Sequence, residues 1–393
     1  MVKLLRLPYV VLNTVFSLMD PPEFIALSLS SKRANNLCSF YRNCAKLKNE
    51  LTEFKVSLSS ESAVFLTFGK SQVIFNICVM SKEQISTDKI LLNELVVPSW
   101  SPDASYIPFD KWHQHTYPYI PKNTIKLFHV KGLLSAMEKW ITYLEGLFHI
   151  PLSTLRLCFD NFNNEEIDRI MDYYCSGRLE RTLDEFCLDS FWETENNALY
   201  NTVPVSILRH QIASKKLIIA FEPSQSFNFY FDLLKSSAKF FKVEFSHWIR
   251  WEQLLDMKFS TVHLCRSKFS SSQFERLVRR WQEGWTPGWK TLMVELCDTF
   301  DILRCIPEQC IDISIYDYPN VASVLRHELI EAFKFRLSVK TSLGKIVKDG
   351  FHLVRSDKMV ATITRENERI CWFSVHPADP EARFKFEVQE RTY

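Results

Sequence analysis

The six residues Ser153-Thr154-Leu155-Arg156-Leu157-Cys158 recur in related form as Ser260-Thr261-Val262-His263-Leu264-Cys265. In both copies apolar and polar side chains alternate, which is the period of a β-strand with one buried face. A capping box, the usual start of a helix, follows each copy at 163–166 and at 270–273. The chain therefore repeats a unit made of a short strand, a turn and an amphipathic helix.

Further strand-like segments lie between and beyond these two copies. Their centres are spaced by about 26 residues, inside the roughly 20–29-residue range of leucine-rich repeats. Where such repeats place Asn, the two copies carry Asp160 and Ser267, so we expect an irregular array without a regular Asn ladder. The apolar pairs that mark the additional strands are Phe186/Leu188, Leu217/Ile219, Val243/Phe245, Leu292/Val294 and Ile311/Ile313.

The segments that flank this array have other patterns. Alternating apolar residues over 50–80 predict a small β-meander. Several prolines among aromatic residues over 98–121 predict a surface or junction loop, and a helix follows over 133–148. Alternation over 350–363 and 384–388 predicts a C-terminal β-hairpin cap, because a repeat array needs its open end covered.

The N-terminus has the pattern of an amphipathic helix. Leu12, Val15, Phe16 and Met19 fall at helical spacing on one face, with polar residues opposite. A signal peptide has no polar face in its apolar region, so we expect no such leader. The sequence Asp20-Pro21-Pro22-Glu23 predicts a capped second helix, and a third helix is expected to start near Ser30-Ser31.

The residues of these three helices resemble the F-box of the large nematode-expanded F-box families. The resemblance rests on Leu7-Pro8, the apolar spacing of the first helix, and the run Leu27-Ser28-x2-Ser31-Lys32-Arg33. It implies docking to the Skp-type adaptor of a cullin-RING ubiquitin ligase. By the same resemblance the adaptor-binding residues are Leu7, Pro8, Leu12, Val15, Phe16, Met19 and Leu27.

A second resemblance, clearest over 210–290, is to the nematode F-box-associated domain of type 2. It rests on Trp248, the strand Thr261–Leu264 and a helix that ends Trp281-x2-Gly284. It implies an α+β chain in which a repeat region binds a protein substrate. The expected domains are an F-box (1–45), a meander with a junction loop (46–125), a repeat region (126–340) and a β cap (341–393).

Composition argues against several other classes of protein. Forty-eight basic against 46 acidic residues give a net charge of +2, with no basic stripe visible along the sequence, so we expect no nucleic-acid partner. No apolar run is long enough to span a membrane. Eleven Cys at irregular spacing predict reduced thiols in an intracellular protein, cytoplasmic or nuclear.

No pattern of an active site is present, so we expect no enzyme activity, cofactor or metal. The sequence has no nucleotide-binding glycine motif and no nucleophile elbow. His113-x-His115 has no nearby third ligand, and Glu165-Glu166 fits the first turn of a helix. Trp285 and Trp289, beside Thr286-Pro287-Gly288, are candidate surface contacts for a substrate.

These observations favour a substrate-recruiting F-box subunit of a ubiquitin ligase. The alternative is a non-catalytic repeat protein that binds partners outside such a ligase. An enzyme with an unrecognised site is a third, less favoured class.

Overall fold

The computed structural model describes residues 7–41, 51–60, 62–69, 71–79, 90–92, 95–97, 122–129, 132–175, 183–190, 199–306, 310–313, 332–335, 339–340, 346–347, 350–357 and 359–377. The chain divides into two compact units. Unit 1 comprises Met1–Phe191 with His210–Ala213, and unit 2 comprises Trp192–Arg209 with Ser214–Tyr393. Within the described residues, no helix is both long and apolar enough to cross a membrane.

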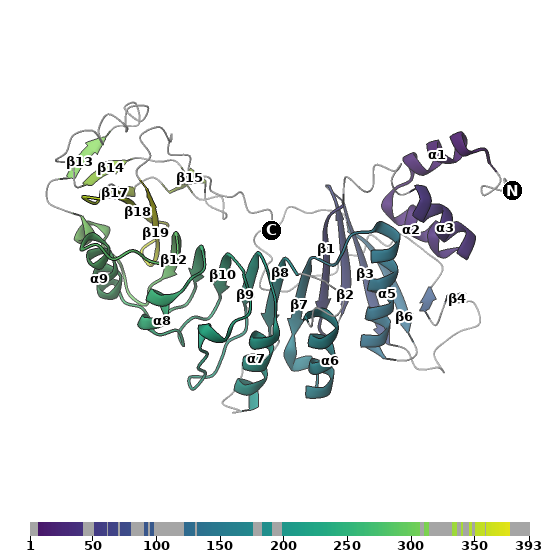
Figure 1. Cartoon of the computed structure of the whole chain (residues 1–393), viewed down its shortest axis with the longest axis horizontal. Coiled ribbons are helices and arrows are strands. Elements are labelled where there is room, and N and C mark those ends of the chain that lie inside the picture. Colours follow the sequence, from purple (N-terminus) through teal and green to yellow (C-terminus); the bar gives the residue numbers. More distant parts are fainter. Residues whose placement is uncertain are drawn as a thin grey trace. The chain divides into compact units, whose positions relative to one another are not determined.

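Unit 1 begins with the three predicted helices, α1 (Tyr9–Leu18), α2 (Pro21–Leu29) and α3 (Lys32–Tyr41), which Figure 1 shows at its N-terminal end. The predicted cap of α2 is confirmed, because the Glu23 carboxylate accepts a 3.1 Å hydrogen bond from the Asp20 N–H. Phe16 forms the centre of the module. It stacks on Tyr41 at 4.8 Å and meets Phe24 edge-on at 6.0 Å.

A mixed sheet follows in unit 1, and its strand pairings give the order β4-β5-β6-β3-β2-β1-β7-β8. Strands β1, β2 and β3 form the predicted antiparallel meander, whereas β7 joins β1 in parallel and β8 joins β7 in parallel. The strands are β1 (Leu51–Leu58), β2 (Ala63–Phe68), β3 (Ser71–Val79), β4 (Ile90–Leu92), β5 (Leu95–Val97), β6 (Lys122–His129), β7 (Thr154–Cys158) and β8 (Glu185–Asp189).

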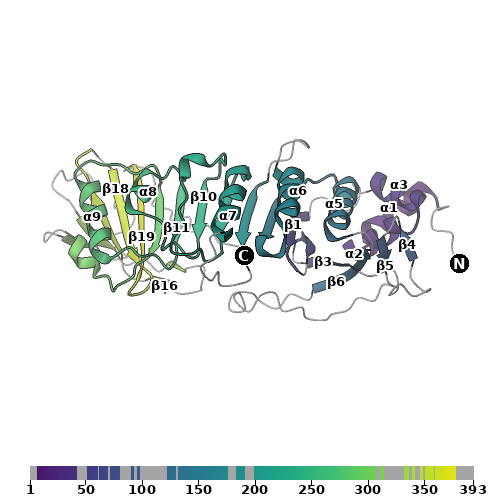
Figure 2. The same ribbon diagram turned by 90° about the horizontal axis from the view of Figure 1, so that it is seen from below.

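Helices α5 (Leu133–Phe148) and α6 (Asn164–Cys175) lie on the same side of the unit 1 strands (Figure 2). Trp140 of α5 packs edge-on against Phe75 of β3, with ring centroids 5.1 Å apart. A short 3-10 turn, η3 (Phe159–Asn161), follows β7, and α6 then starts at the predicted capping box, where the Glu166 N–H donates to Asn163 Oδ1 at 3.0 Å.

Unit 2 contains a second mixed sheet, with strand order β9-β10-β11-β12-β19-β18-β17-β14-β13. Its first four strands are parallel, and β19 then pairs with β12 in the antiparallel sense. The strands are β9 (Lys216–Ile219), β10 (Phe240–Val243), β11 (Thr261–Leu264), β12 (Thr291–Glu295), β13 (Cys310–Ile313), β14 (Ala332–Phe335), β17 (Gly350–Val354), β18 (Met359–Arg365) and β19 (Ile370–Pro377); β15 (Val339–Lys340) and β16 (Ile346–Val347) pair with each other.

One face of this sheet is covered by α9 (Ser271–Gln282) and the short α8 (Trp251–Asp256). Leu292 and Val294 of β12 face these helices and line a small apolar cavity with Phe274 and Leu277 of α9. Helix α7 (Leu199–His210) precedes β9, while the 3-10 turns η4 (Phe231–Leu233) and η5 (Ile302–Cys305) lie in connections. Burial of alternate strand residues against the helices makes the core, as the strand period predicts.

Most of the local predictions are confirmed. Strands occur at the two copies of the repeat and at each additional apolar pair, although β10 ends at Val243, so Phe245 lies outside it. The predicted C-terminal hairpin is β17–β18, and it is one part of a longer meander whose third strand, β19, extends the sheet from β12. The junction loop (98–121) and the segment 384–388 lie outside the described residues.

Candidate protein-binding surfaces

Helix α1 has two apolar faces rather than one. Leu12 and Phe16 point into the three-helix module and are buried. Val10 and Leu18 are 73% and 78% exposed, and Val11 is exposed as well. Because Val11 and Leu18 are seven residues apart, they lie on the same side of the helix, away from the Leu12–Phe16 face.

An exposed aromatic pair joins this outer surface. Phe40 near the end of α3 is 61% exposed and contacts the exposed Tyr9 at the start of α1, with ring centroids 6.1 Å apart. Exposed apolar side chains scattered singly are ordinary, but a group on one small module indicates a binding surface. We call this group the α1–α3 patch, and its members are Tyr9, Val10, Val11, Leu18 and Phe40.

The adaptor-binding residues expected from the sequence occupy different environments. Pro8 is exposed, and Leu7, Val15, Met19 and Leu27 are partly exposed. Leu12 and Phe16 are 5% and 0% exposed, so in this conformation they support the surface from within rather than form it. Sequence reasoning missed Val10, Val11, Leu18 and Phe40. The available signal was the presence of large apolar residues outside the Leu12–Phe16 stripe.

The three-helix module is fixed to the rest of unit 1 through α5. Ser28 of α2 and Tyr143 of α5 share a short hydrogen bond between their hydroxyl groups, and Phe24 contacts Phe148 at 6.1 Å. Burial raises the pKa of Tyr143 to about 12. The phenol therefore remains protonated near neutral pH and can keep this bond. The surface on α1 and α3 is thus presented in a fixed orientation relative to α5.

The tryptophans expected at a substrate surface prove to have separate roles. Trp289 is 1% exposed, and its indole N–H donates to the Leu254 carbonyl oxygen at 3.2 Å. This burial corrects the expectation that Trp289 lies on the surface, because its ring packs against Phe373 in the core. Trp285 is partly exposed beside it, with its ring 6.2 Å from that of Trp289, and Arg280 lies over the Trp285 ring.

Aromatic side chains also line the face of the unit 2 sheet opposite α9. His263 of β11 meets Phe240 of β10 at 4.8 Å and Trp372 of β19 at 5.1 Å. Phe240 and Trp372 are partly exposed. Phe373, the neighbour of Trp372, contacts Phe274 and Trp281 of α9, which places Trp372 on the other side of the sheet.

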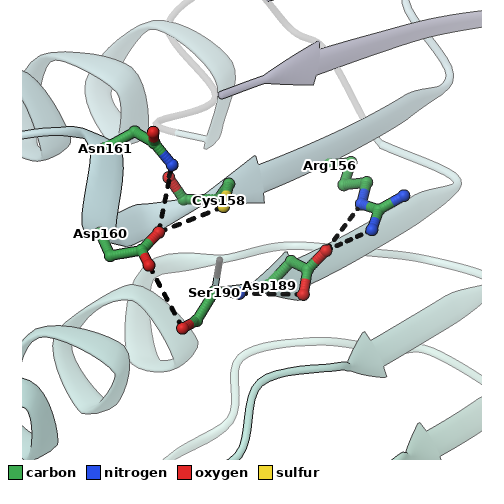
Figure 3. A network of polar contacts seen from close by, with 6 residues as sticks. All are labelled: Arg156, Cys158, Asp160, Asn161, Asp189 and Ser190. Carbon is green, nitrogen blue, oxygen red and sulfur yellow. Dashed lines mark hydrogen bonds and ion pairs between the residues drawn. The ribbon is translucent and has the colours of Figure 1, made fainter. Parts of the chain in front are cut away.

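A polar network in unit 1 joins the carboxyl ends of β7 and β8 (Figure 3). Arg156 donates to the Asp189 carboxylate, Ser190 donates to Asp160, and Asn161 donates to Asp160 and to the Cys158 carbonyl oxygen. The Cys158 thiol lies 3.1 Å from Asp160 Oδ1, and burial together with this carboxylate raises its pKa. A thiol held in its protonated form is a poor nucleophile. We therefore assign the network a structural role, in which it links the carboxyl ends of β7 and β8.

Other groups considered for chemistry have structural roles or lie outside the described residues. Glu166 accepts from the Asn163 N–H, so this carboxylate caps α6 as expected. Within the described ranges, no three His, Cys, Asp or Glu side chains come together in a way that could hold a metal ion. His113 and His115 are not among these residues, so the expectation of no metal site stays a prediction.

Comparison with known families matches residues 4–45 to the F-box domain. These residues include α1, α2 and α3 and therefore the whole α1–α3 patch. F-box domains bind the Skp adaptor in cullin-RING ligases. No curated protein and no solved structure was found to match the chain.

Proposed function

We propose that this chain recruits protein substrates to a cullin-RING ubiquitin ligase, with its F-box docked on a Skp-type adaptor. The observation that carries the proposal is the α1–α3 patch, five exposed apolar side chains on the domain that matches the F-box. Full burial of one such side chain contributes about 1.5–3 kcal/mol. Several together can offset an association cost of about 4 kcal/mol or more.

The finer part of the proposal concerns the rest of the chain. We assign the strand–helix units to an irregular leucine-rich-repeat-like array, similar to the F-box-associated domain of type 2. Support comes from the parallel strands β9 to β12 and from the turn and helix that follow β7 and β11. The partly exposed Phe240 and Trp372 make the face opposite α9 the favoured substrate surface, with Trp285 as a further candidate contact.

The proposed role is non-catalytic and intracellular. Burial raises the pKa of Cys175 and Cys305 to about 12, so these thiols stay protonated and unreactive near neutral pH. The cysteines whose side chains the structure describes are free thiols, which supports the proposal of a reducing compartment. The second candidate, a repeat-type binding protein outside a ligase, shares the repeat surface but assigns no partner to the α1–α3 patch.

The test is co-purification of the full chain with a Skp-type adaptor. Val11→Asp with Leu18→Asp changes exposed side chains, so the variant should fold normally and lose the adaptor. Lys32→Gln with Asn36→Asp is the matched control, because it also changes the charge by −2 and both positions are exposed polar side chains of α3. Retention of the adaptor by the first variant, or absence of adaptor binding by the native chain, would favour the second candidate.

A further inference from the structure

Exposed lysines stand at the amino ends of the parallel strands in unit 2. Lys215 and Lys216 lie at the start of β9, Lys239 directly precedes β10, and Lys290 directly precedes β12. Lys258 lies three residues before β11. All five side chains are exposed, and we call this set the amino-edge lysines.

Main-chain hydrogen bonds show that the amino ends of these strands are neighbours across the sheet. The Lys239 N–H donates to the Lys215 carbonyl oxygen at 3.1 Å, and the Thr261 N–H donates to the Lys239 carbonyl oxygen at 2.9 Å. The Lys290 N–H donates to the Ser260 carbonyl oxygen at 2.8 Å. Adjacent strands are about 4.8 Å apart, so the row from Lys215 to Lys290 extends across three such spacings, about 14 Å.

The opposite edge of the same strands differs in charge. There the Glu244 carboxylate pairs with Lys242 at 2.6 Å, and Glu295 accepts from the Arg266 N–H at 2.8 Å. These carboxylates are therefore used within the sheet. The amino edge concentrates positive charge instead.

Three of the amino-edge lysines are not neutralised in this way. In the part of the chain that the structure describes, no carboxylate lies within ion-pair distance of Lys239, Lys258 or Lys290. Like charges on adjacent strands repel and lower stability. Proteins retain such locally unfavourable arrangements mainly where function uses them. An anionic partner would remove the repulsion.

We propose that the amino-edge lysines bind an acidic, extended segment of the protein substrate. This inference rests on the proposed function, since it names the chemistry of the substrate. At about 3.3 Å per residue, a row of about 14 Å matches four to five residues of extended chain. Lysine acts as a mobile point charge that accepts carboxylates without fixed geometry, which suits Asp and Glu side chains of varied spacing.

An acidic peptide fits this edge better than a nucleic acid does. Nucleic-acid-binding domains usually have a pI above about 9, whereas the pI of this chain is about 7.9. The row is not visible along the sequence, because these lysines become neighbours only when strands far apart in sequence pair.

The test uses the full chain with its adaptor and a fluorescein-labelled octapeptide of alternating Glu and Ser. Fluorescence anisotropy should show binding that weakens as salt is raised, because exposed charges are screened. Lys239→Gln with Lys258→Gln and Lys290→Gln should weaken binding by about tenfold, since each exposed ion pair contributes modestly. The corresponding triple Arg variant keeps the charge and should bind like the native chain.

The control triple is Lys268→Gln with Arg276→Gln and Arg279→Gln, three exposed cations elsewhere in unit 2. It removes the same charge and should leave peptide binding unchanged. Equal weakening by both triples, no peptide binding by the native chain, or lysine-dependent binding of a labelled single-stranded RNA octamer in place of the peptide overturns the inference. Adaptor co-purification is measured on the same samples. Its loss with peptide binding intact would reject the ligase role and leave the acidic-segment site standing.

Discussion

The Arg355 guanidinium donates a 2.8 Å hydrogen bond to the main-chain carbonyl oxygen of Trp281, 74 residues earlier in the chain. Trp281 lies in the last turn of α9, where carbonyl groups have no partner within the helix. The same guanidinium donates to the Trp285 carbonyl oxygen at 3.0 Å and lies over the Trp281 ring. Arg355 therefore ties the turn between β17 and β18 to the C-terminal end of α9.

Replacing Arg355 should destabilise unit 2 strongly. The side chain is 7% exposed, and Arg355→Met removes its hydrogen bonds to the Trp281 and Trp285 carbonyl oxygens, of which the first keeps the Gly284 N–H at 3.1 Å. Hydrogen bonds to a charged group contribute about 1.5–3 kcal/mol each, and we expect a net loss of about 2–4 kcal/mol. Urea unfolding followed by tryptophan fluorescence measures the change. Arg276→Met, at an exposed position of α9, should shift the free energy of unfolding by less than about 0.5 kcal/mol.

The ion pair between Arg355 and Asp357 predicts that the stability of the fold depends on pH. The Arg355 side chain donates to Asp357 at 2.7 Å and holds the pKa of this carboxyl below its ordinary value. A lowered folded-state pKa stabilises the folded state above the unfolded pKa of about 3.9, and this stability is lost as pH falls through the folded pKa. Asp357 is half exposed, so the effect should be small.

The measurement compares the native chain with Asp357→Asn between pH 6 and pH 3. The difference in unfolding free energy should stay constant down to about pH 4 and shrink below it. A difference that does not change with pH would contradict the assigned role of the carboxylate.

The close approach of two chain segments at Gly288 gives a steric prediction. A Cβ atom at this position would lie 2.7 Å from the Met257 carbonyl oxygen, which is main chain and cannot move easily. Gly288→Ala should therefore cost about 1–3 kcal/mol, as overpacking does. Gly146 in α5 has no atom within 4 Å of its added Cβ. Gly146→Ala should instead stabilise the chain by about 0.5–1 kcal/mol through helix propensity. Thermal unfolding should show a lower Tm than that of the native chain for Gly288→Ala and a higher Tm for Gly146→Ala.

Local features of the fold could be predicted from the sequence, because their causes are local. Alternation placed β7 and β11, and capping residues placed the start of α2, α6 and α9. Gly284 was expected to end α9, and it has the positive φ of 108° that glycine readily adopts. The patterns that specify these elements extend over only a few residues each.

Features that depend on contacts between segments far apart in the sequence could not be predicted in the same way. The burial of Trp289 depends on its contact with Phe373 of β19, and the row of amino-edge lysines depends on the register of four strands. The α1–α3 patch was missed for a related reason. Helical periodicity identifies an apolar face, but only packing shows that Leu12 is buried while Leu18 is exposed.

The contact between the F-box and α5 yields a last prediction, about how rigidly the adaptor surface is held. Phe148 is buried between Phe24 of α2 and Phe68 of β2, so it links the helical module to the sheet. Phe148→Ala should cost about 3–5 kcal/mol and speed amide hydrogen exchange in α2 as well as in α5. Tyr143→Phe removes only the hydroxyl bonded to Ser28 and should cost about 1 kcal/mol.

Hydrogen exchange with mass spectrometry separates a coupled module from an independent one. If the three helices are held by α5, the Phe148→Ala variant should lose protection in α2 while it still binds the Skp-type adaptor. Unchanged protection in α2 would show that the module folds without α5. The contacts of α2 with α5 would then not fix the orientation of the adaptor surface relative to α5.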